Sequence, residues 1–406
     1  MPGPNLLMDR PGAVLEITCA DQLAEPVIAG WRSQAERLLE AVGWGGEELA
    51  VRRYPGGASL ALSAPIDVLL AATEINEWAL EAAGAVLNGS PQPSLDEAAR
   101  RIRELIAGEA NPGLRALREA ALSHGVQLLA DPELVSVGSG TGSLTWPRDQ
   151  LPSPADIDWS RVHDVPIALV TGSNGKTTTV RLLGAVVAAA GRVAGWSCTD
   201  NVTVAGASIS EGDWAGPGGA RMVLRDQRVE IAILETARGG ILRRGLAVTR
   251  ADAAIVTNIA EDHFGEWGVY DLPTLAEAKL VVSRAVGSSG RVVLNADDVE
   301  LVAAARRVGA PITWISLDPS LPLVRQHLEA GGDACLLEAG ELVLRRAGVR
   351  EAVAPVADVP LTMSGAARHN VYNALGVIGL ASAIGIPAQA VARGLRAFRG
   401  TPEENP

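Results

Sequence analysis

The sequence predicts an α/β fold in which a P-loop-type, doubly wound and mostly parallel sheet follows a separate α+β N-terminal domain. From Val165 onward, short apolar runs alternate with helical segments, which is typical of βαβ units and a parallel sheet. A glycine loop ending in Gly175-Lys176-Thr177 follows the first of these runs. A stretch rich in proline, Trp146 to Asp158, precedes them and predicts a linker. We therefore expect an N-terminal domain over residues 1–160, a central domain over 161–400 and the start of another linker over 401–406.

The same patterns predict the order of the elements. In the N-terminal part, a helical block from Ser94 to His124 is broken at Asn111-Pro112-Gly113, and the rest mixes strand-like and helical stretches. In the central part, apolar runs predict strands at Ile167–Thr171, Glu230–Glu235, Ala253–Asn258, Arg291–Asn295 and Ile312–Ser316. The segments between and after them predict helices at Thr177–Ala190, Leu275–Val286, Val299–Val308, Asn370–Ile384 and Ala388–Phe398.

The composition excludes several classes of protein. The chain has 35 Lys and Arg against 47 Asp and Glu, and its net charge of −12 does not suit a nucleic-acid partner. Cys19, Cys198 and Cys335 form no CxxC pair, so neither a disulfide framework nor a zinc site is indicated. Asp9 and Arg10 interrupt the start of the chain, so we expect no signal peptide there, and no apolar run is long enough for a membrane span. We expect a cytoplasmic protein whose partners are small molecules or a peptide.

The loop after the first central strand has the residue types that a phosphate site needs. Gly172 and Gly175 let backbone N–H groups approach phosphate oxygens, and the start of the next helix adds a favourable dipole. Lys176 is expected to reach the β- and γ-phosphates of ATP, and the Thr177 hydroxyl to bind Mg²⁺. Val170 stands where the GxxxxGK[ST] pattern has its first glycine, so a chance Gly-Lys-Thr turn is the alternative. The residues expected at the nucleotide are Gly172, Ser173, Asn174, Gly175, Lys176, Thr177 and Thr178.

This loop, Thr171 to Thr179, resembles the phosphate loop of the Mur ligase family. Three more segments carry the resemblance: Thr257 to His263, Gly365 to Ala374, and Glu230 to Gly245, which is close to the version in the cyanophycin synthetase branch. The resemblance covers about Val165 to Pro406 and implies the ATP-binding central domain of an amide ligase. Residues 1–160 offer no second nucleotide site, so the ATP-grasp domain of cyanophycin synthetases is not expected. The chain ends where the C-terminal domain of the family is expected to begin.

The resemblance also implies roles for single residues. Glu235, at the end of a buried strand, is expected to bind Mg²⁺, and His263 to bind a second magnesium ion. Asn258 and Asn370 are expected to meet the nucleotide, and Lys279 matches a position at which many members carry a carbamylated lysine. The candidate catalytic residues are Lys176, Glu235, His263 and Lys279.

Each of these residues has a simpler alternative. Glu235 is otherwise a helix N-cap or a surface acid, and His263 is an ordinary loop histidine. Asn370 is otherwise the cap of the helix that follows it, and Lys279 an exposed helix lysine.

Arginines in glycine-rich surroundings are candidates for binding the carboxylates of substrates, because the guanidinium group captures a carboxylate with two hydrogen bonds. The segment Cys198-Thr199-Asp200-Asn201 also resembles the cyanophycin synthetase branch. The candidate substrate residues are therefore Thr199, Asp200, Arg221, Arg238 and Arg243, with Arg244 beside them.

The leading hypothesis is an ADP-forming ligase that joins an amino acid to a peptide-like carboxylate through an acyl phosphate, with ATP and up to two Mg²⁺ ions. The first alternative is a folylpolyglutamate-synthase-like or peptidoglycan-type ligase. The second is a nucleotide-binding scaffold without catalysis. Association into a homo-oligomer is left open.

Overall fold

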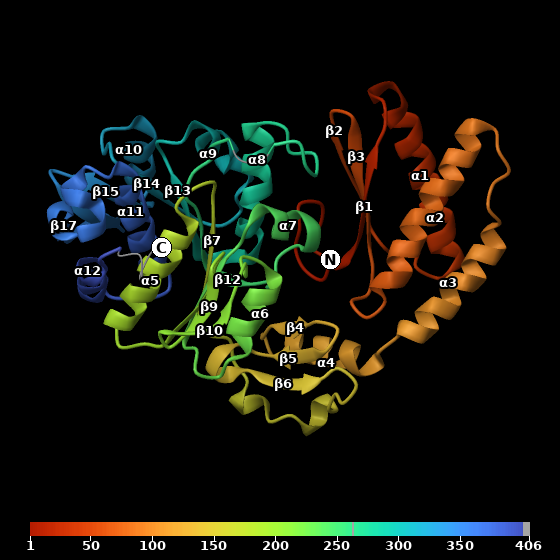
Figure 1. Cartoon of the computed structure of the whole chain (residues 1–406), viewed down its shortest axis with the longest axis horizontal. Helices are drawn as coiled ribbons and strands as arrows, with labels where there is room; N and C mark the ends of the chain where they lie inside the picture. The colour runs from red at the N-terminus through yellow and green to blue at the C-terminus, as the bar shows by residue number, and fades with distance from the viewer. Residues whose placement is uncertain (262–263, 401–406) are drawn as a thin grey trace.

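The computed structural model describes residues 1–261 and 264–400, and one large sheet forms its centre (Figure 1). Its strands are β7 (Ile167–Thr171), β8 (Ala194–Ser197), β9 (Asn201–Val204), β10 (Ala207–Glu211), β11 (Ile231–Glu235), β12 (Ala251–Val256), β13 (Val286–Asn295), β14 (Ile312–Ser316), β15 (Asp333–Glu338), β16 (Glu341–Arg346) and β17 (Val349–Pro355). They form an 11-stranded sheet in the order β10-β9-β8-β11-β7-β12-β13-β14-β15-β16-β17. From β8 to β15 neighbours run parallel, and the edge pairs run antiparallel. The predicted doubly wound, mostly parallel α/β fold is confirmed.

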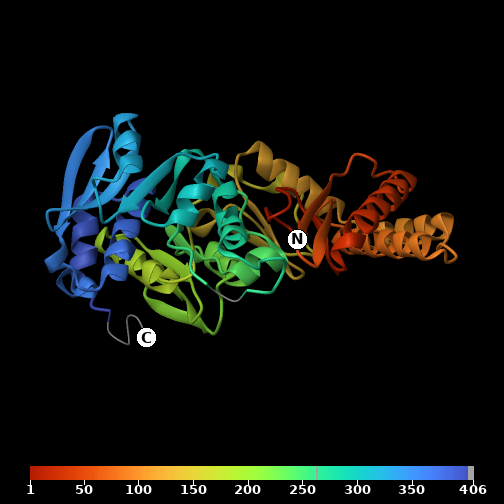
Figure 2. The same ribbon diagram turned by 90° about the horizontal axis from the view of Figure 1, so that it is seen from above.

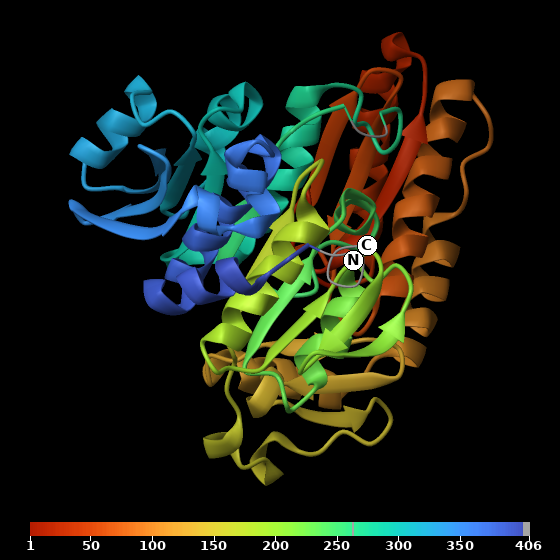
Figure 3. The ribbon, with the colours of Figure 1, turned by 60° about the vertical axis from the view of Figure 1, so that its left-hand side comes forward.

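Helices cover both faces of this sheet. They are α5 (Lys176–Ala189), α6 (Pro217–Arg225), α7 (Arg238–Arg244), α8 (Leu272–Lys279), α9 (Val299–Ala304), α10 (Pro322–Glu329), α11 (Arg368–Ala383) and α12 (Ala388–Ala397). Figure 3 shows α5, α11 and α12 side by side on one face, where they contact one another. Alternate residues of β7 point to opposite layers: Leu169 packs with α6 to α10, and Ala168 and Val170 pack with α5, α11 and α12. Burial on both faces explains why these strands are unbroken apolar runs.

The predicted elements differ from the structure mainly at their ends. The strands predicted at Ile167–Thr171 and Ile312–Ser316 have the bounds of β7 and β14. The helix predicted over Leu275–Val286 is instead α8 followed by a 3-10 helix, Leu280–Ala285. The sequence patterns did not predict the parallel strands β8 and β15, the antiparallel edge strands β9, β10, β16 and β17, or the helices α6, α7 and α10.

The N-terminal body has its own small sheet and core. It consists of β1 (Gly12–Thr18), α1 (Asp21–Ala41), β2 (Leu49–Tyr54), β3 (Gly57–Ser63), α2 (Leu69–Asn88) and α3 (Leu95–Glu109), with strand order β1-β3-β2. Figure 2 shows it at the far end of the molecule from the C-terminal helices. Trp31 is fully buried and donates from Nε1 to Asn76 Oδ1 at 2.7 Å, so the indole N–H is satisfied within this core. None of the helices that the structure describes is long and apolar enough to cross a membrane.

A third, small body lies between these two and contains α4 (Pro112–Ser123), β4 (Leu128–Ala130), β5 (Leu134–Val137) and β6 (Leu144–Pro147). Part of the stretch predicted as a linker belongs to it: Trp146 lies in β6, and Ile157 is buried in the same core as Leu114. Just beyond that stretch, Trp159 stacks on His124 with ring centroids 4.3 Å apart. Large apolar side chains between the prolines explain why this segment packs. The division of the chain near residue 160 remains a prediction.

Candidate functional site

The phosphate loop connects β7 to α5 at the centre of the sheet. Gly172 and Gly175 have φ values of +144° and +80°, in the region that favours glycine. Gly175 is the N-cap of α5, so the first N–H groups of this helix have no partner within the helix and are open to an anion. A side chain at Gly172 would overlap the hydroxyl of Thr257, which lies against the loop.

Replacing Gly175 with alanine is expected to weaken ATP binding. The new Cβ would overlap Asn373 Oδ1, and the left-handed backbone would cost roughly 1 kcal/mol. Gly191, at the other end of α5, has a similar φ of +75°, and a Cβ added there would have nothing within 4 Å. Gly191→Ala is therefore the control for strain alone. We expect about tenfold weaker binding for Gly175→Ala only, measured by equilibrium titration with a fluorescent ATP analogue; equal affinities in the two variants would contradict this geometry.

The segment after β12 holds the phosphate loop in place. The Thr257 hydroxyl donates to the Asn174 carbonyl at 2.6 Å, and the backbone N–H of Asn174 donates to Asn258 Oδ1 at 3.1 Å. The Ser173 hydroxyl donates to the Ala260 carbonyl at 2.9 Å. Asn258, predicted at the nucleotide, thus lies at the loop and fixes its backbone.

Thr177 and Glu235 lie next to each other across the parallel strands. The Thr177 hydroxyl donates to Glu235 Oε2 at 2.9 Å and lies 3.2 Å from the hydroxyl of Thr199. Glu235 is 1% exposed. Burial raises its pKa, which the hydrogen bond from Thr177 and the charge of Lys176 only partly offset.

This pair fits a magnesium ion. Glu235 Oε1 is buried and has no hydrogen-bond partner among the described residues, and a buried carboxylate oxygen needs one. Mg²⁺ is commonly held by one or two protein oxygens together with phosphates and water. Within residues 1–261 and 264–400, no three His, Cys, Asp or Glu side chains form a metal cluster, so substrate oxygens and water would complete the shell. The position predicted for a second ion, His263, lies outside the described residues.

The structure excludes three of the simpler alternatives. Glu235 is neither a surface acid nor a helix N-cap, because it is buried in β11 and the N-cap of α7 is Ala237. Asn370 does not cap α11, whose N-cap is Ala367; it lies in the first turn, donates to the Leu361 carbonyl and accepts from Asn373. Lys279 is not an exposed helix lysine, since it is 1% exposed.

Both lysines of the sequence lie at the phosphate loop. Lys176 Nζ donates to the Ser173 carbonyl at 3.0 Å, and Lys279 Nζ donates to the Gly172 carbonyl at 2.9 Å. The other basic residues of the chain are arginines and histidines. A compact ammonium side chain therefore occurs only where a phosphate is expected.

A cavity of about 640 Å³ opens beside Lys176 and Lys279. Its walls include the predicted substrate residues Thr199, Arg238 and Arg243, together with Trp214 and Glu266. The two other predicted substrate residues lie elsewhere. Asp200 pairs with Arg181 at 2.7 Å, and Arg221 lines a neighbouring cavity.

The central part of this chain is similar to known proteins. Residues 170–381, more than half of the chain, match the model of the Mur ligase middle domain. The chain belongs to the Mur ligase family. It is 37% identical over 242 residues to the cyanophycin synthetase of Synechocystis sp., covering 60% of this chain and 28% of that protein. It is 30% identical over 257 residues to the UDP-N-acetylmuramoylalanine--D-glutamate ligase of Chlorobium luteolum, covering 62% of this chain and 50% of that one.

The N-terminal body touches a loop that borders the candidate site. Arg52 of β2 donates from Nη1 to the Trp267 carbonyl at 3.2 Å and from Nη2 to the Gly268 carbonyl at 2.8 Å. The rings of Tyr54 and Tyr270 lie 5.9 Å apart. Glu266 of the same loop pairs with Arg238, 3.3 Å away, at the wall of the 640 Å³ cavity.

Arg52→Ala is expected to loosen this loop. Two charge-assisted hydrogen bonds are lost, so we expect the free energy of unfolding to fall by about 1–3 kcal/mol. Protease cleavage between residues 264 and 271 should become faster. Arg53→Ala is the matched control, because its side chain is exposed and pairs with Glu25 inside the N-terminal body. Equal cleavage rates in both variants and the wild type would contradict the docking described here.

Several residues of the candidate site were not singled out from the sequence. They are Thr257 and Asn373 at the phosphate loop, and Trp214 and Glu266 at the cavity. Thr257 and Asn373 lay within the resembling segments, so their positions could have been suspected, but their contacts with the loop depend on tertiary structure.

Proposed function

We propose that residues 161–400 bind ATP and Mg²⁺ for an ADP-forming amide ligase that joins an amino acid to a peptide-like carboxylate. One observation carries the proposal: the buried carboxylate of Glu235, with an unpartnered oxygen, faces the Thr177 hydroxyl beside Lys176 and the glycine loop. Membership in the Mur ligase family and the likeness to cyanophycin synthetase support the same reaction type.

In the proposed reaction, a carboxylate oxygen of the acceptor attacks the γ-phosphorus of ATP, and the bond from this phosphorus to the bridging oxygen breaks to release ADP. The amine of the incoming amino acid then attacks the acyl carbon. Inorganic phosphate leaves with the former carboxylate oxygen, and the amine loses a proton. The product is an amide.

The residues of the site suit the first step. The glycine loop and the start of α5 offer N–H groups to the phosphates, and the Lys176 ammonium offsets charge on the transferring group. Thr177 and Glu235 would hold Mg²⁺, which when bound neutralises phosphate oxygens and orients them. The adjoining cavity is wide enough for the reacting ends of two substrates, and Arg238 and Arg243 supply guanidinium groups for a carboxylate.

The test is amine-dependent ADP release from Mg-ATP, with twenty amino acids offered against aspartate-rich, arginine-rich and glutamate acceptors. A peptidoglycan-type and a folate-type acceptor are included because those ligases are the nearest alternatives. Release that needs one amine and one acceptor, with the matching mass gain in the acceptor, would support the proposal. ATP binding without release under every combination would favour a scaffold instead.

A further inference from the structure

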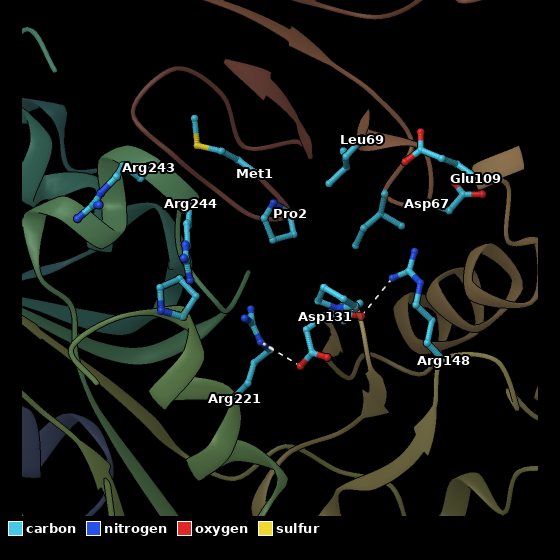
Figure 4. Close-up of a pocket in the computed structure, with 14 residues that line it drawn as sticks. Met1, Pro2, Asp67, Leu69, Glu109, Asp131, Arg148, Arg221, Arg243 and Arg244 are labelled. Carbon is cyan, nitrogen blue, oxygen red and sulfur yellow. Dashed lines mark hydrogen bonds and ion pairs between the residues drawn. The ribbon is translucent and has the colours of Figure 1, made fainter. Parts of the chain in front are cut away.

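A second cavity, of about 460 Å³, lies where the three bodies meet. Figure 4 shows its basic side chains: Arg148, Arg221 and Arg244 extend toward the space from different elements, while Arg243 turns away from it. The apolar part of the wall includes Pro2, Ile66, Leu69, Ala130, Pro132 and Pro217.

Two of these arginines have no carboxylate partner within the described part of the chain. The Arg148 side chain donates only to the backbone carbonyl of Asp131, at 3.3 Å, and the Arg244 side chain has neither a hydrogen-bond nor an ion-pair partner there. Arg221 shares the Asp131 carboxylate with Arg225. One carboxylate between two guanidinium groups leaves this cluster with net positive charge.

The acidic groups of the cavity already have partners. Burial raises the pKa of the Asp131 carboxyl group. Hydrogen bonds from the Leu134 backbone and from Arg225 outweigh this effect and hold the pKa below its ordinary value. Both carboxylate oxygens of Glu109 accept from backbone N–H groups at the start of α2, at 3.1 and 2.8 Å. Asp67 pairs with Arg115 at 3.1 Å, yet its buried Oδ1 has no partner among the residues described. An N–H donor on a bound molecule would satisfy this oxygen.

The two cavities adjoin at the end of α7. Pro217, Arg243 and Arg244 line both of them. Adjacent helix residues point about 100° apart, so Arg243 can face the 640 Å³ cavity while Arg244 faces the smaller one. The smaller cavity therefore lies next to the one in which the reacting end of an acceptor is expected.

We propose that the 460 Å³ cavity binds a second carboxylate of the acceptor, one or more residues away from the carboxylate that reacts. This inference rests on the proposed ligase function. Arg148, Arg221 and Arg244 would hold the acid, the apolar wall would pack on its stem, and the unpartnered oxygen of Asp67 would accept from an acceptor N–H. The acceptor class is thus a peptide-like chain with more than one acidic group.

The test measures binding of fluorescein-labelled peptides to the full chain by anisotropy, without ATP. The peptides share their C-terminal residue and carry aspartate, asparagine or phosphoserine at one upstream position, varied along the peptide. We expect the best aspartate peptide to bind at least about tenfold more tightly than its asparagine counterpart. Arg148→Gln and Arg244→Gln should each remove most of this preference, while Arg161→Gln, an exposed arginine of the same small body, should keep it.

Equal affinity of the aspartate and asparagine peptides for the wild-type chain would overturn the proposal, without relying on any variant to fold. A preference that survives both substitutions would overturn the assignment to this cavity. If only the phosphoserine peptide bound tightly, the group bound in this cavity would be a phosphate and not a carboxylate, and the proposal would be overturned. Because no ATP is present, a failed ligase assay leaves this result intact, and the two proposals are tested separately.

Discussion

Lys176→Ala is expected to reduce amine-dependent ADP release by about 10²–10³-fold. Removing one preorganised group that stabilises charge in a transition state typically has an effect of this size. The ammonium group lies at the loop and donates to the Ser173 carbonyl, so it is held where a phosphate would bind. The measurement is the single-turnover rate of ADP formation at saturating Mg-ATP, which separates the chemical step from product release.

The control for this variant is its stability. Lys176 is partly exposed and lies in the first turn of α5, so its loss should change the free energy of unfolding by no more than about 1 kcal/mol. Lys176→Arg should not restore the rate, because the planar guanidinium group does not replace a compact ammonium. Full activity in a folded Lys176→Ala protein would show that the phosphate loop does not act in the reaction as proposed.

Glu235→Gln is expected to reduce ADP release by a similar factor. It should also remove the stabilisation of the folded protein by Mg-ATP. In the metal-free protein, the buried carboxylate has one unpartnered oxygen, so the neutral amide should be at least as stable there. The measurement is thermal unfolding with and without Mg-ATP. A ligand present at about 100 times its Kd stabilises the folded state by about 2.7 kcal/mol, which this variant should lack.

Glu230→Gln is the matched control for this pair. Glu230 immediately precedes β11, pairs with Arg192 and accepts from the Val193 backbone, away from the phosphate loop. It should keep both activity and the response to Mg-ATP. A Glu235→Gln protein that is still stabilised by Mg-ATP as the wild type is would show that this carboxylate does not hold the ion.

The central fold was predictable because local pattern and tertiary environment agree there. Strands buried on both faces read as apolar runs, and β7 and β14 were predicted to the residue. The edge hairpins lacked such a signal. They turn at Ala205-Gly206, Ala339-Gly340 and Ala347-Gly348, where both residues have positive φ. Asparagine or aspartate before glycine is the usual mark of such turns, and alanine gives none.

Only the part of the candidate site that consists of consecutive residues was predictable from the sequence. The sequence indicated the glycine loop, Lys176 and Thr177 from a continuous motif. Whether Glu235 and Lys279 are buried depends on neighbours far away in the chain, and the structure settled both. The contact of Arg52 with the Trp267 carbonyl joins residues 215 positions apart, and no sequence pattern predicts such a pairing.

The small body also includes a segment that the sequence did not predict to be packed. Its proline-rich segment was predicted from composition as a linker, yet Trp146 and Ile157 are part of a packed core. Proline limits regular structure but does not prevent an irregular segment from burying apolar side chains. One residue of this segment, Arg148, lines the cavity at the junction of the three bodies.

The most direct test of the central claim follows one oxygen atom. The acceptor is prepared with oxygen-18 in the reacting carboxylate and incubated with Mg-ATP and the matching amine. If the site forms an acyl phosphate, one labelled oxygen must appear in the inorganic phosphate for each amide formed. Unlabelled phosphate, with its new oxygen taken from water, would mean that the chain hydrolyses ATP without activating the acceptor, and would contradict the ligase assignment.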